Sequence, residues 1–195
     1  VNSMSRTYPT SPIFSTIGFR SVNYNLSSQS ISGRTQVRNI GGQRFEFSAQ
    51  YTRMTRSEFA PILVFTMAQR GSAETFTIVL PQISSKSGDA SGTILVNGAA
   101  DIGATTVGVD GVTGTLKAGD MVKFANHSKV YMLTADRAGN GNISIQPALR
   151  VAVPNDNAVT FDSVPFTVRL NNDVQEFNLG SASLVDYEID MIEAV

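Results

Sequence analysis

The chain of 195 residues contains no cysteine and only one histidine, His127. Without cysteine there can be no disulfide framework, no thiolate metal site and no cysteine nucleophile. A single histidine cannot build a multi-histidine metal site, and no nucleophile-elbow pattern accompanies it to indicate a Ser-His-Asp triad. Because His127 falls in an Asn-His-Ser turn between two short apolar strings, we interpret it as a solvated turn residue.

The sequence also lacks an excess of charge of one sign, because it contains 15 basic and 16 acidic residues. No segment concentrates Lys and Arg as binding to nucleic acid or to a membrane surface would require, so we expect neither partner. The longest apolar stretch, residues 60–68, is far shorter than the about 20 residues that span a bilayer. No basic-then-apolar signal segment opens the chain, so we expect a soluble protein without a secretory signal.

Alternation of apolar and polar residues with a period of two is the main pattern in the sequence. It predicts strands near residues 22–26, 45–52, 166–170 and 185–191. A polar strand candidate, residues 34–40, is joined to the second of these by Gly41-Gly42, a pair suited to a two-residue hairpin turn. Because the first strand of this hairpin is weakly apolar, it is either a solvated edge or a surface for another subunit.

One helix is predicted at about residues 57–70, where large apolar side chains recur at spacings of three and four. Thr55 and Glu58 have the spacing of a capping box, but a start there leaves Pro61 beyond the first turn. A cap at Ser57 places the proline within that turn, so we favour Ser57. Arg70 and Gly71 then supply a basic last turn and a stop.

The composition changes after Ser85, because ten of the sixteen glycines and all four lysines lie between residues 86 and 141. Short apolar strings separated by Gly, Asn and Asp turns follow one another there, which suggests a small barrel or sandwich. The sequence therefore predicts a mainly β protein with one helix. One β domain, residues 1–85 plus 161–195, is interrupted by an inserted β-barrel module, residues 86–160.

Three carboxylates, Asp186, Glu188 and Asp190, alternate along the last predicted strand and share one face, about 7 Å apart in succession. They could hold a hard cation such as Ca²⁺, take part in acid-base chemistry, or form a solvated or inter-subunit face opposite arginines. We favour the last interpretation. No other segment matches a calcium loop or a phosphate-binding loop, and we expect no cofactor, no metal and no catalytic residue.

Nine of the eleven arginines lie outside the predicted insert, and several surround the predicted hairpin. Arginine is suited to fixed carboxylate pairing across interfaces. We therefore predict an interface between subunits that uses basic side chains of the hairpin and acidic side chains of the last strand: Arg34, Arg38, Arg44, Asp186, Glu188 and Asp190.

Five segments follow one another in a recognisable order: residues 41–47 (GGQRFEF), 54–59 (MTRSEF), 68–71 (AQRG), 74–81 (ETFTIVLP) and 187–193 (YEIDMIE). Together they resemble minor tail proteins of bacteriophages, which lie at the distal end of the tail tube. The insert resembles a β module of phage tail proteins through residues 116–124 (LKAGDMVKF), 130–131, 143–149 (ISIQPAL) and 157–159. The resemblance covers most of the chain and contains no catalytic fingerprint.

The resemblance implies a tail-tube-like domain whose subunits form a ring, often hexameric, around the tail axis of the virion after synthesis in the host cytoplasm. Tube or tape-measure protein then lies on one side and hub or fibre proteins lie on the other. We expect residues 34–51 to make ring contacts by strand addition. A distal tail protein and a baseplate hub or tube initiator both fit. Host glycan or receptor binding by the insert is the alternative, although the insert lacks tryptophan and paired aromatics; a cell-wall hydrolase using the three acids is a third class.

Overall fold

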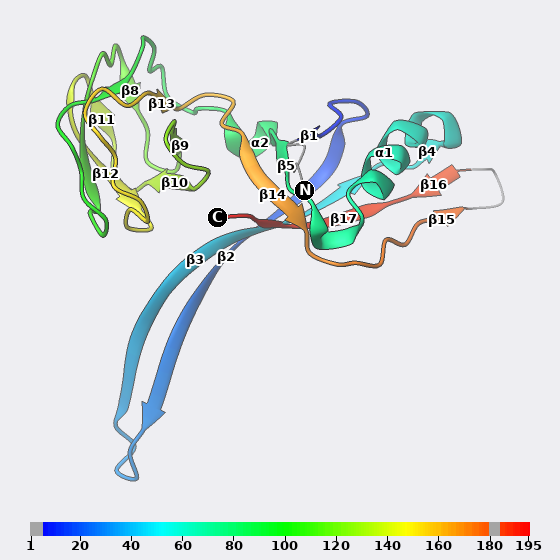
Figure 1. The fold of residues 1–195 in the computed structure, drawn as a ribbon, viewed down its shortest axis with the longest axis horizontal. Coiled ribbons are helices and arrows are strands. Elements are labelled where there is room, and N and C mark those ends of the chain that lie inside the picture. The colour runs from blue at the N-terminus through cyan, green and yellow to red at the C-terminus, as the bar shows by residue number, and fades with distance from the viewer. Residues whose placement is uncertain (1–5, 180–183) are drawn as a thin grey trace. The chain divides into compact units, whose positions relative to one another are not determined.

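The computed structural model describes residues 6–179 and 184–195, which are arranged in two compact units (Figure 1). The first unit holds residues 76–168 together with the described residues at the two chain ends, up to Tyr8 and from Ala194. The second unit holds residues 9–75 and 169–193 apart from the undescribed stretch. Strands dominate both units, and among the described residues only one helix is longer than four residues, so the prediction of a mainly β protein with one helix is confirmed.

The first unit contains a nearly closed six-stranded barrel. In spatial order its strands are β13 (Val159–Thr160), β9 (Met121–Phe124), β10 (Val130–Leu133), β12 (Gly141–Gln146), β7 (Thr106–Asp110) and β6 (Leu95–Val96). Hydrogen bonds from Val96 N to Asn157 O and from Val159 N to Ile94 O join the two edge strands of this order. A separate pair, β8 (Thr115–Leu116) and β11 (Arg137–Ala138), accompanies the barrel.

The barrel encloses its own apolar core, which is drawn from residues 90–159 with Phe161 packed against it. Along β7 and β12, buried side chains alternate with partly or fully exposed ones, as closed sheets require. The two aromatics of residues 86–160, Phe124 and Tyr131, are fully buried in it. The predicted insert boundaries, 86 and 160, stay a prediction, because the first unit also includes residues 76–85 and 161–168.

The remaining elements of the first unit are three strands and a short helix. They are β1 (Arg6–Thr7), β5 (Phe76–Ile78), β14 (Phe166–Leu170, whose last two residues belong to the second unit) and α2 (Pro81–Ser84). β1 runs parallel to β5, and β14 runs antiparallel to it, with Phe166 opposite Ile78. Tyr8 follows β1 and is buried against Phe76, the ring centroids being 5.7 Å apart.

The second unit is built on long antiparallel strands. Its elements are β2 (Phe14–Gln29), β3 (Thr35–Tyr51), β4 (Met54–Thr55), α1 (Arg56–Ala68), a 3-10 turn η1 (Gly71–Ala73), β15 (Asn178–Leu179), β16 (Leu184–Asp186) and β17 (Glu188–Glu193). β3 lies between β2 and β17, and β16 lies between β15 and β4. The predicted alternation holds along β3, where Phe45, Phe47, Ala49 and Tyr51 are buried.

The predicted hairpin is wrong, because its two strands, residues 34–40 and 45–52, do not pair across Gly41-Gly42 but follow one another along the single strand β3. The hairpin is instead formed by β2 and β3, and the chain reverses at residues 30–34. There the Ser30 backbone N–H donates to the Arg34 carbonyl, the Arg34 backbone N–H donates to the Ser30 hydroxyl oxygen, and Gly33 has φ +81°. Gly41 and Gly42 also have positive φ, at +83° and +77°, but they lie inside β3 at shifts in its register with β2. Two successive residues with positive φ can form either a β-bulge or a turn, and Gly41 and Gly42 form a bulge.

The helix also begins earlier than predicted, because Thr55 and not Ser57 is the N-cap of α1. The Thr55 hydroxyl accepts from the Glu58 backbone N–H, and the Glu58 carboxylate accepts from the Thr55 backbone N–H at 2.8 Å, which completes the capping box. Pro61 lies inside the helix, so the capping box outweighs the single hydrogen bond that the proline removes. The helix ends at Ala68, and Arg70 follows in the left-handed conformation instead of forming a basic last turn.

His127 is half-buried rather than solvated as predicted, and both of its ring nitrogens are hydrogen-bonded. Nδ1 lies 2.8 Å from the Asn126 amide oxygen, which can only accept, so Nδ1 carries the proton and Nε2 accepts from the Tyr131 hydroxyl at 2.9 Å. The Tyr131 oxygen in turn accepts from the Arg150 backbone N–H at 3.2 Å. The neutral imidazole therefore satisfies this network completely.

Acid should destabilise the barrel through His127. Burial lowers the pKa of this imidazole, and the charges of Lys123 and Lys129 lower it further, so the folded protein binds the proton less readily than the unfolded chain. Neutral His127 therefore contributes to the stability of the fold at pH values above about 6.5, the pKa of histidine in an unfolded chain. This contribution is lost as the pH falls from there toward the lower pKa of His127 in the folded protein. Melting temperatures measured between pH 7.5 and 5.5 should fall for the native protein and fall less for His127→Gln, and identical curves would contradict this role.

Candidate assembly surface

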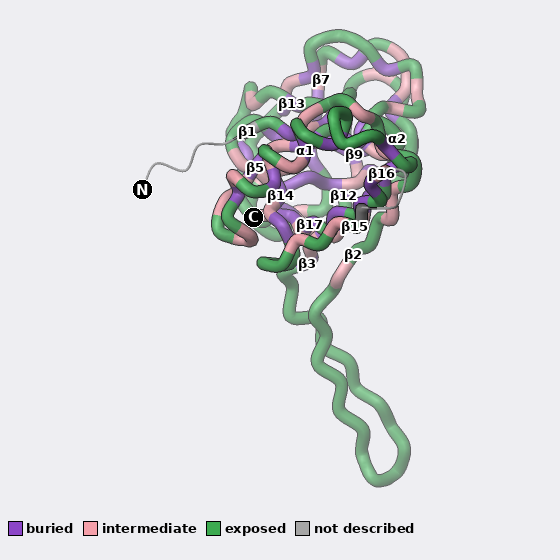
Figure 2. Tube along the Cα trace, turned by 90° about the vertical axis from the view of Figure 1, so that its right-hand side faces the viewer, coloured by how far each residue is buried: buried purple, intermediate pink, exposed green. Residues whose placement is uncertain are grey.

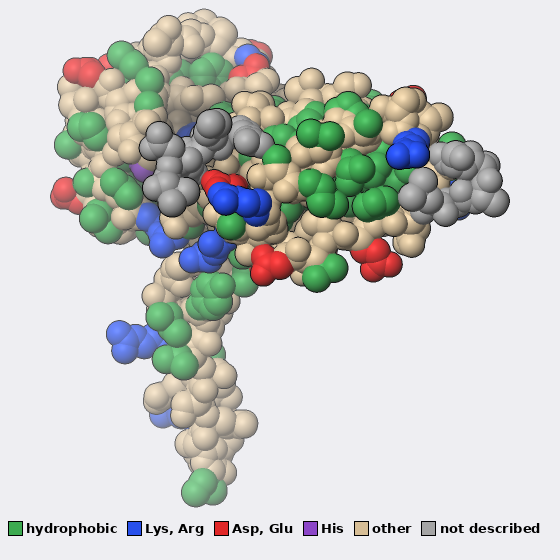
Figure 3. Space-filling model, turned by 45° about the vertical axis from the view of Figure 1, so that its right-hand side comes forward, with side chains coloured by type: hydrophobic (Ala, Val, Ile, Leu, Met, Phe, Trp, Pro, Cys, Tyr) green, Lys and Arg blue, Asp and Glu red, His purple; other side chains and the backbone are tan. Residues whose placement is uncertain are grey.

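The outer half of the β2–β3 hairpin, residues 23–42, is here called the arm, and every one of its residues is exposed (Figure 2). Five large apolar side chains stand among its polar ones: Ile31 at the tip is fully exposed, and the exposed fractions of the others are 46% for Tyr24, 62% for Leu26, 64% for Val37 and 59% for Ile40. Basic and hydrophobic side chains are both visible along the arm in Figure 3. Such exposure in one contiguous element marks a surface that contacts another molecule.

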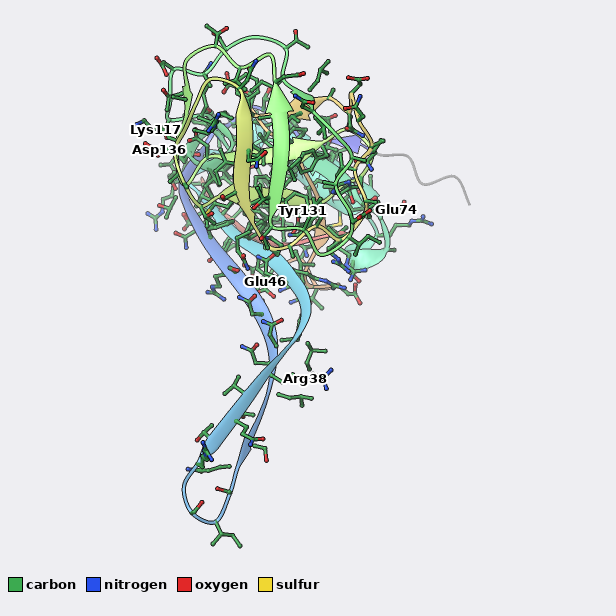
Figure 4. The ribbon with its side chains drawn as sticks, turned by 90° about the vertical axis from the view of Figure 1, so that its left-hand side faces the viewer. Arg38, Glu46, Glu74, Lys117, Tyr131 and Asp136 are labelled. Carbon is green, nitrogen blue, oxygen red and sulfur yellow. The ribbon has the colours of Figure 1, made fainter. Side chains whose placement is uncertain are left out.

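The three predicted arginines lie at different heights of the hairpin. Arg34 is at the tip, Arg38 is inside the arm opposite Leu26, and Arg44 is at the base opposite Val22. Arg38 projects from the arm, with Glu46 nearer the body of the protein, in Figure 4. Within the described chain none of the three arginines forms an ion pair, so their charges are available to a partner.

The three predicted carboxylates do lie on one exposed face, with the buried residues Val185, Tyr187, Ile189 and Met191 alternating between and after them. Asp186 pairs with the Nε of Arg53 at 3.1 Å, and Glu188 accepts from the Gln50 amide at 3.1 Å. The side chains of Arg53 and Asp186 are both well exposed, and exposed ion pairs contribute little to the stability of a fold. The structure brings the acids together but does not bring Arg34 or Arg38 to them within one chain.

The acids border an open depression of about 640 Å³ in the second unit, here called the groove. It is lined by Gln50, Tyr51, Asn172, Val174, Gln175, Glu176, Asn178, Asp186, Tyr187, Glu188 and Asp190. The rings of Tyr51 and Tyr187 stack with centroids 6.3 Å apart. Burial raises the pKa of Tyr187, whereas a hydrogen bond with Thr66 opposes that rise and the charge of Asp190 adds to it, so the phenol stays neutral.

The wall of the groove formed by residues 171–178 is held in place by specific contacts. Asp173 accepts from the Ser72 hydroxyl at 2.6 Å and from the Ser72 backbone N–H at 2.9 Å, and these two bonds, in that order, lower its pKa. A side chain at Gly71 would meet Asp173 at 2.7 Å, which explains the glycine there. Gln175 accepts from the Tyr187 hydroxyl at 3.0 Å, so the groove is preformed.

Sequence reasoning missed the groove wall and the apolar residues of the arm. Nothing local marks residues 171–178 as a wall, because the Asp173–Ser72 contact joins positions 101 residues apart. A signal for the arm was present, since Tyr24 and Leu26 alternate with polar residues within a predicted strand, but such alternation is typical of a strand with one buried face. In the structure both side chains are exposed.

Two kinds of feature are absent from the described residues. No group of three or more His, Asp or Glu side chains is close enough in this part of the chain to hold a metal ion. None of its helices is both long and apolar enough to cross a bilayer. The described surface does carry an exposed arm and a preformed acidic groove.

Comparison with known proteins identifies the class as phage tail protein. Residues 83–164 match the family model described as "Distal tail protein pb9, B domain", a range that encloses the predicted insert. Over 174 residues the chain is 26% identical to the distal tail protein pb9 of Escherichia phage T5, a match that covers 84% of this chain and 84% of that protein. The predicted resemblance to tail-tip proteins is confirmed, and the chain is a pb9-like phage tail protein, a structural component of the virion.

Proposed function

We propose that the chain is a non-enzymatic subunit that forms a ring at the distal end of the tail. The ring links the tail tube or tape-measure protein on one side to hub or fibre proteins on the other. No cofactor takes part, and the protein acts in the virion after synthesis in the host cytoplasm. The similarity to a distal tail protein supports the location, and the exposed arm supports assembly.

The arm is the single observation that carries the proposal. A two-stranded hairpin alone is marginally stable in water, so the arm gains its stability from a neighbour. β17 pairs with β3 only at residues 46–50, so among the described strands the outer part of β3 has one unpaired edge. This edge can accept a strand from a second subunit, and Arg34, Arg38 and Arg44 can meet Asp186, Glu188 and Asp190 across the interface.

The solution mass tests the ring. Light scattering of the purified protein over a concentration series should give a closed oligomer, and we expect a hexamer of six times the 20.9 kDa protomer. A trimer would keep the ring with another symmetry. A strict monomer up to high concentration, with and without tail-tube protein, would overturn the proposal.

Host glycan binding through the barrel is less well supported. Sugar recognition favours exposed aromatic faces for stacking. Phe124 and Tyr131, the two aromatics of residues 86–160, are both fully buried. The barrel therefore offers no such face within this range, and assembly remains the proposed function.

A further inference from the structure

The arm joins the rest of the second unit through an irregular stretch of the β2–β3 hairpin. Val22 lies opposite Arg44 on the body side of this stretch, and Asn25 lies opposite Asn39 on the arm side. β3 therefore uses five residue steps where β2 uses three, and the two extra residues fall at the bulge of residues 41–42. A bulge bends its strand and increases the local twist, so this one sets the direction in which the arm leaves the body.

Neither strand pairing nor packing explains the bulge. The pairing of β2 with β3 is regular on both sides of it. A side chain at Gly41 would meet no atom within 4 Å, so no close contact requires the chain to bulge there. Without residues 41–42 the hairpin would have one continuous register, and because two is an even number every side chain would keep its face. The bulge therefore serves the direction of the arm.

The hairpin is anchored on the body side of the bulge and not on the arm side. Gln43 is buried, and its Nε2 donates to the Ser21 hydroxyl oxygen at 2.8 Å. Phe45 is buried as well, and its backbone N–H donates to the Glu193 carboxylate at 3.2 Å. All of residues 23–42 are exposed, so the described part of the body gives the arm little packing. The border between the two parts coincides with two glycines, whose φ angles change at less cost than those of other residues.

One side chain stabilises the bulge as the structure has it. The Asn39 Oδ1 accepts a hydrogen bond from the Gly41 backbone N–H at 2.7 Å. Asparagine commonly makes such bonds to the backbone two residues further on. Because the bond is exposed, water can replace it, so it favours the present bend without fixing it.

We propose that the bulge of residues 41–42 is a hinge about which the arm swings as a unit. A hinge absorbs a change of direction in the φ and ψ angles of a few residues. The arm keeps its own strand pairing during this motion, because its regular register begins at Asn25 and Asn39. In the ring proposed above, the motion brings the arm onto a neighbouring subunit. This last step rests on the proposed function, whereas the hinge itself does not.

The distance between two spin labels tests the hinge in the full chain. Because the chain has no cysteine, Gln36→Cys in the arm and Arg56→Cys on α1, both exposed, place the labels without removal of a native thiol. Double electron–electron resonance on dilute, monomeric protein should give a broad distance distribution. Deletion of residues 41–42 should narrow this distribution at least about twofold, because the hairpin then has no glycine joint.

A deletion of the same size is the matched control. Gln29 and Thr35 are partners in register near the tip, and their removal also shortens the chain by two residues but keeps the bulge. This control should leave the distribution as broad as before, and Asn39→Ala should broaden it. Equal widths with and without residues 41–42, or the same narrowing by the control deletion, would overturn the hinge. Circular dichroism should show that each variant is folded.

The link between the hinge and the ring is measured separately. Where the native chain forms a ring, deletion of residues 41–42 should weaken assembly at least about tenfold in mass photometry, because a fixed arm rarely has the direction that the neighbour requires. Unchanged assembly would overturn that link. A native chain that stays monomeric at every concentration would overturn the ring, and the label distances would still decide whether the bulge is a hinge.

Discussion

Removal of the arm should convert the ring into folded monomers. In the variant, residues 23–43 are replaced by Asn-Gly, so that Val22 and Arg44, which are partners in register, flank a two-residue turn. The deleted residues contribute no large apolar side chain to the core, whereas Phe45, Phe47 and Ala49 are kept. The loss of all arm contacts should raise the dissociation constant of the oligomer above the concentrations that can be measured. Most of the binding energy of an interface comes from a few buried residues, among which aromatic residues and arginine are common.

Light scattering would measure this loss, and thermal unfolding would verify the fold. Asn25→Ser, a conservative change at an exposed polar residue of the same arm, is the matched control and should leave the solution mass unchanged. If the deletion variant still forms the native oligomer, the arm does not make the ring contacts. The ring would then have to use another surface of the protein.

Local sequence patterns predicted the strands of this fold well. Period-two alternation found the core face of β3 and the exposed carboxylates of β17, because each strand has one buried face and one exposed face. The short apolar strings of the barrel also became strands, since Gly, Asn and Asp punctuate them. These features depend only on neighbours in sequence.

Features that depend on partners distant in sequence could not be predicted. Gly41 and Gly42 suit a turn or a bulge equally, and the choice follows from the pairing of β2 with β3, which extends past them to Gln29 and Thr35. The groove needs residues 171–178 to meet Ser72 and Tyr187. Neither the register of β2 with β3 nor the contacts of residues 171–178 leave a periodic signal in the sequence. The sequence therefore predicted the acidic side chains but not the groove that they border.

Truncation of Phe124 in the core of the barrel should destabilise the barrel strongly without dissociating the ring. Phe124 is fully buried, and the centroid of its ring lies 5.6 Å from the ring centroid of Tyr131 and 5.9 Å from that of His127. Phe124→Ala removes this packing and leaves a cavity, which typically costs about 3–5 kcal/mol of unfolding free energy. We propose that residues 86–160 fold as an independent insert, so hydrogen exchange should accelerate in β9 and β10 but not in β3 or α1.

Tyr131→Phe is the control that separates packing from hydrogen bonding, because it keeps the ring and removes only the hydroxyl that binds His127 and the Arg150 backbone N–H. The loss of that buried hydroxyl should cost about 1–3 kcal/mol, less than the loss of the phenyl ring. If Phe124→Ala instead accelerates exchange in β3 and lowers the solution mass, the barrel and the arm-bearing domain unfold together. The barrel would then be part of the ring's structural core and not a separable insert, because its stability would support the contacts between subunits.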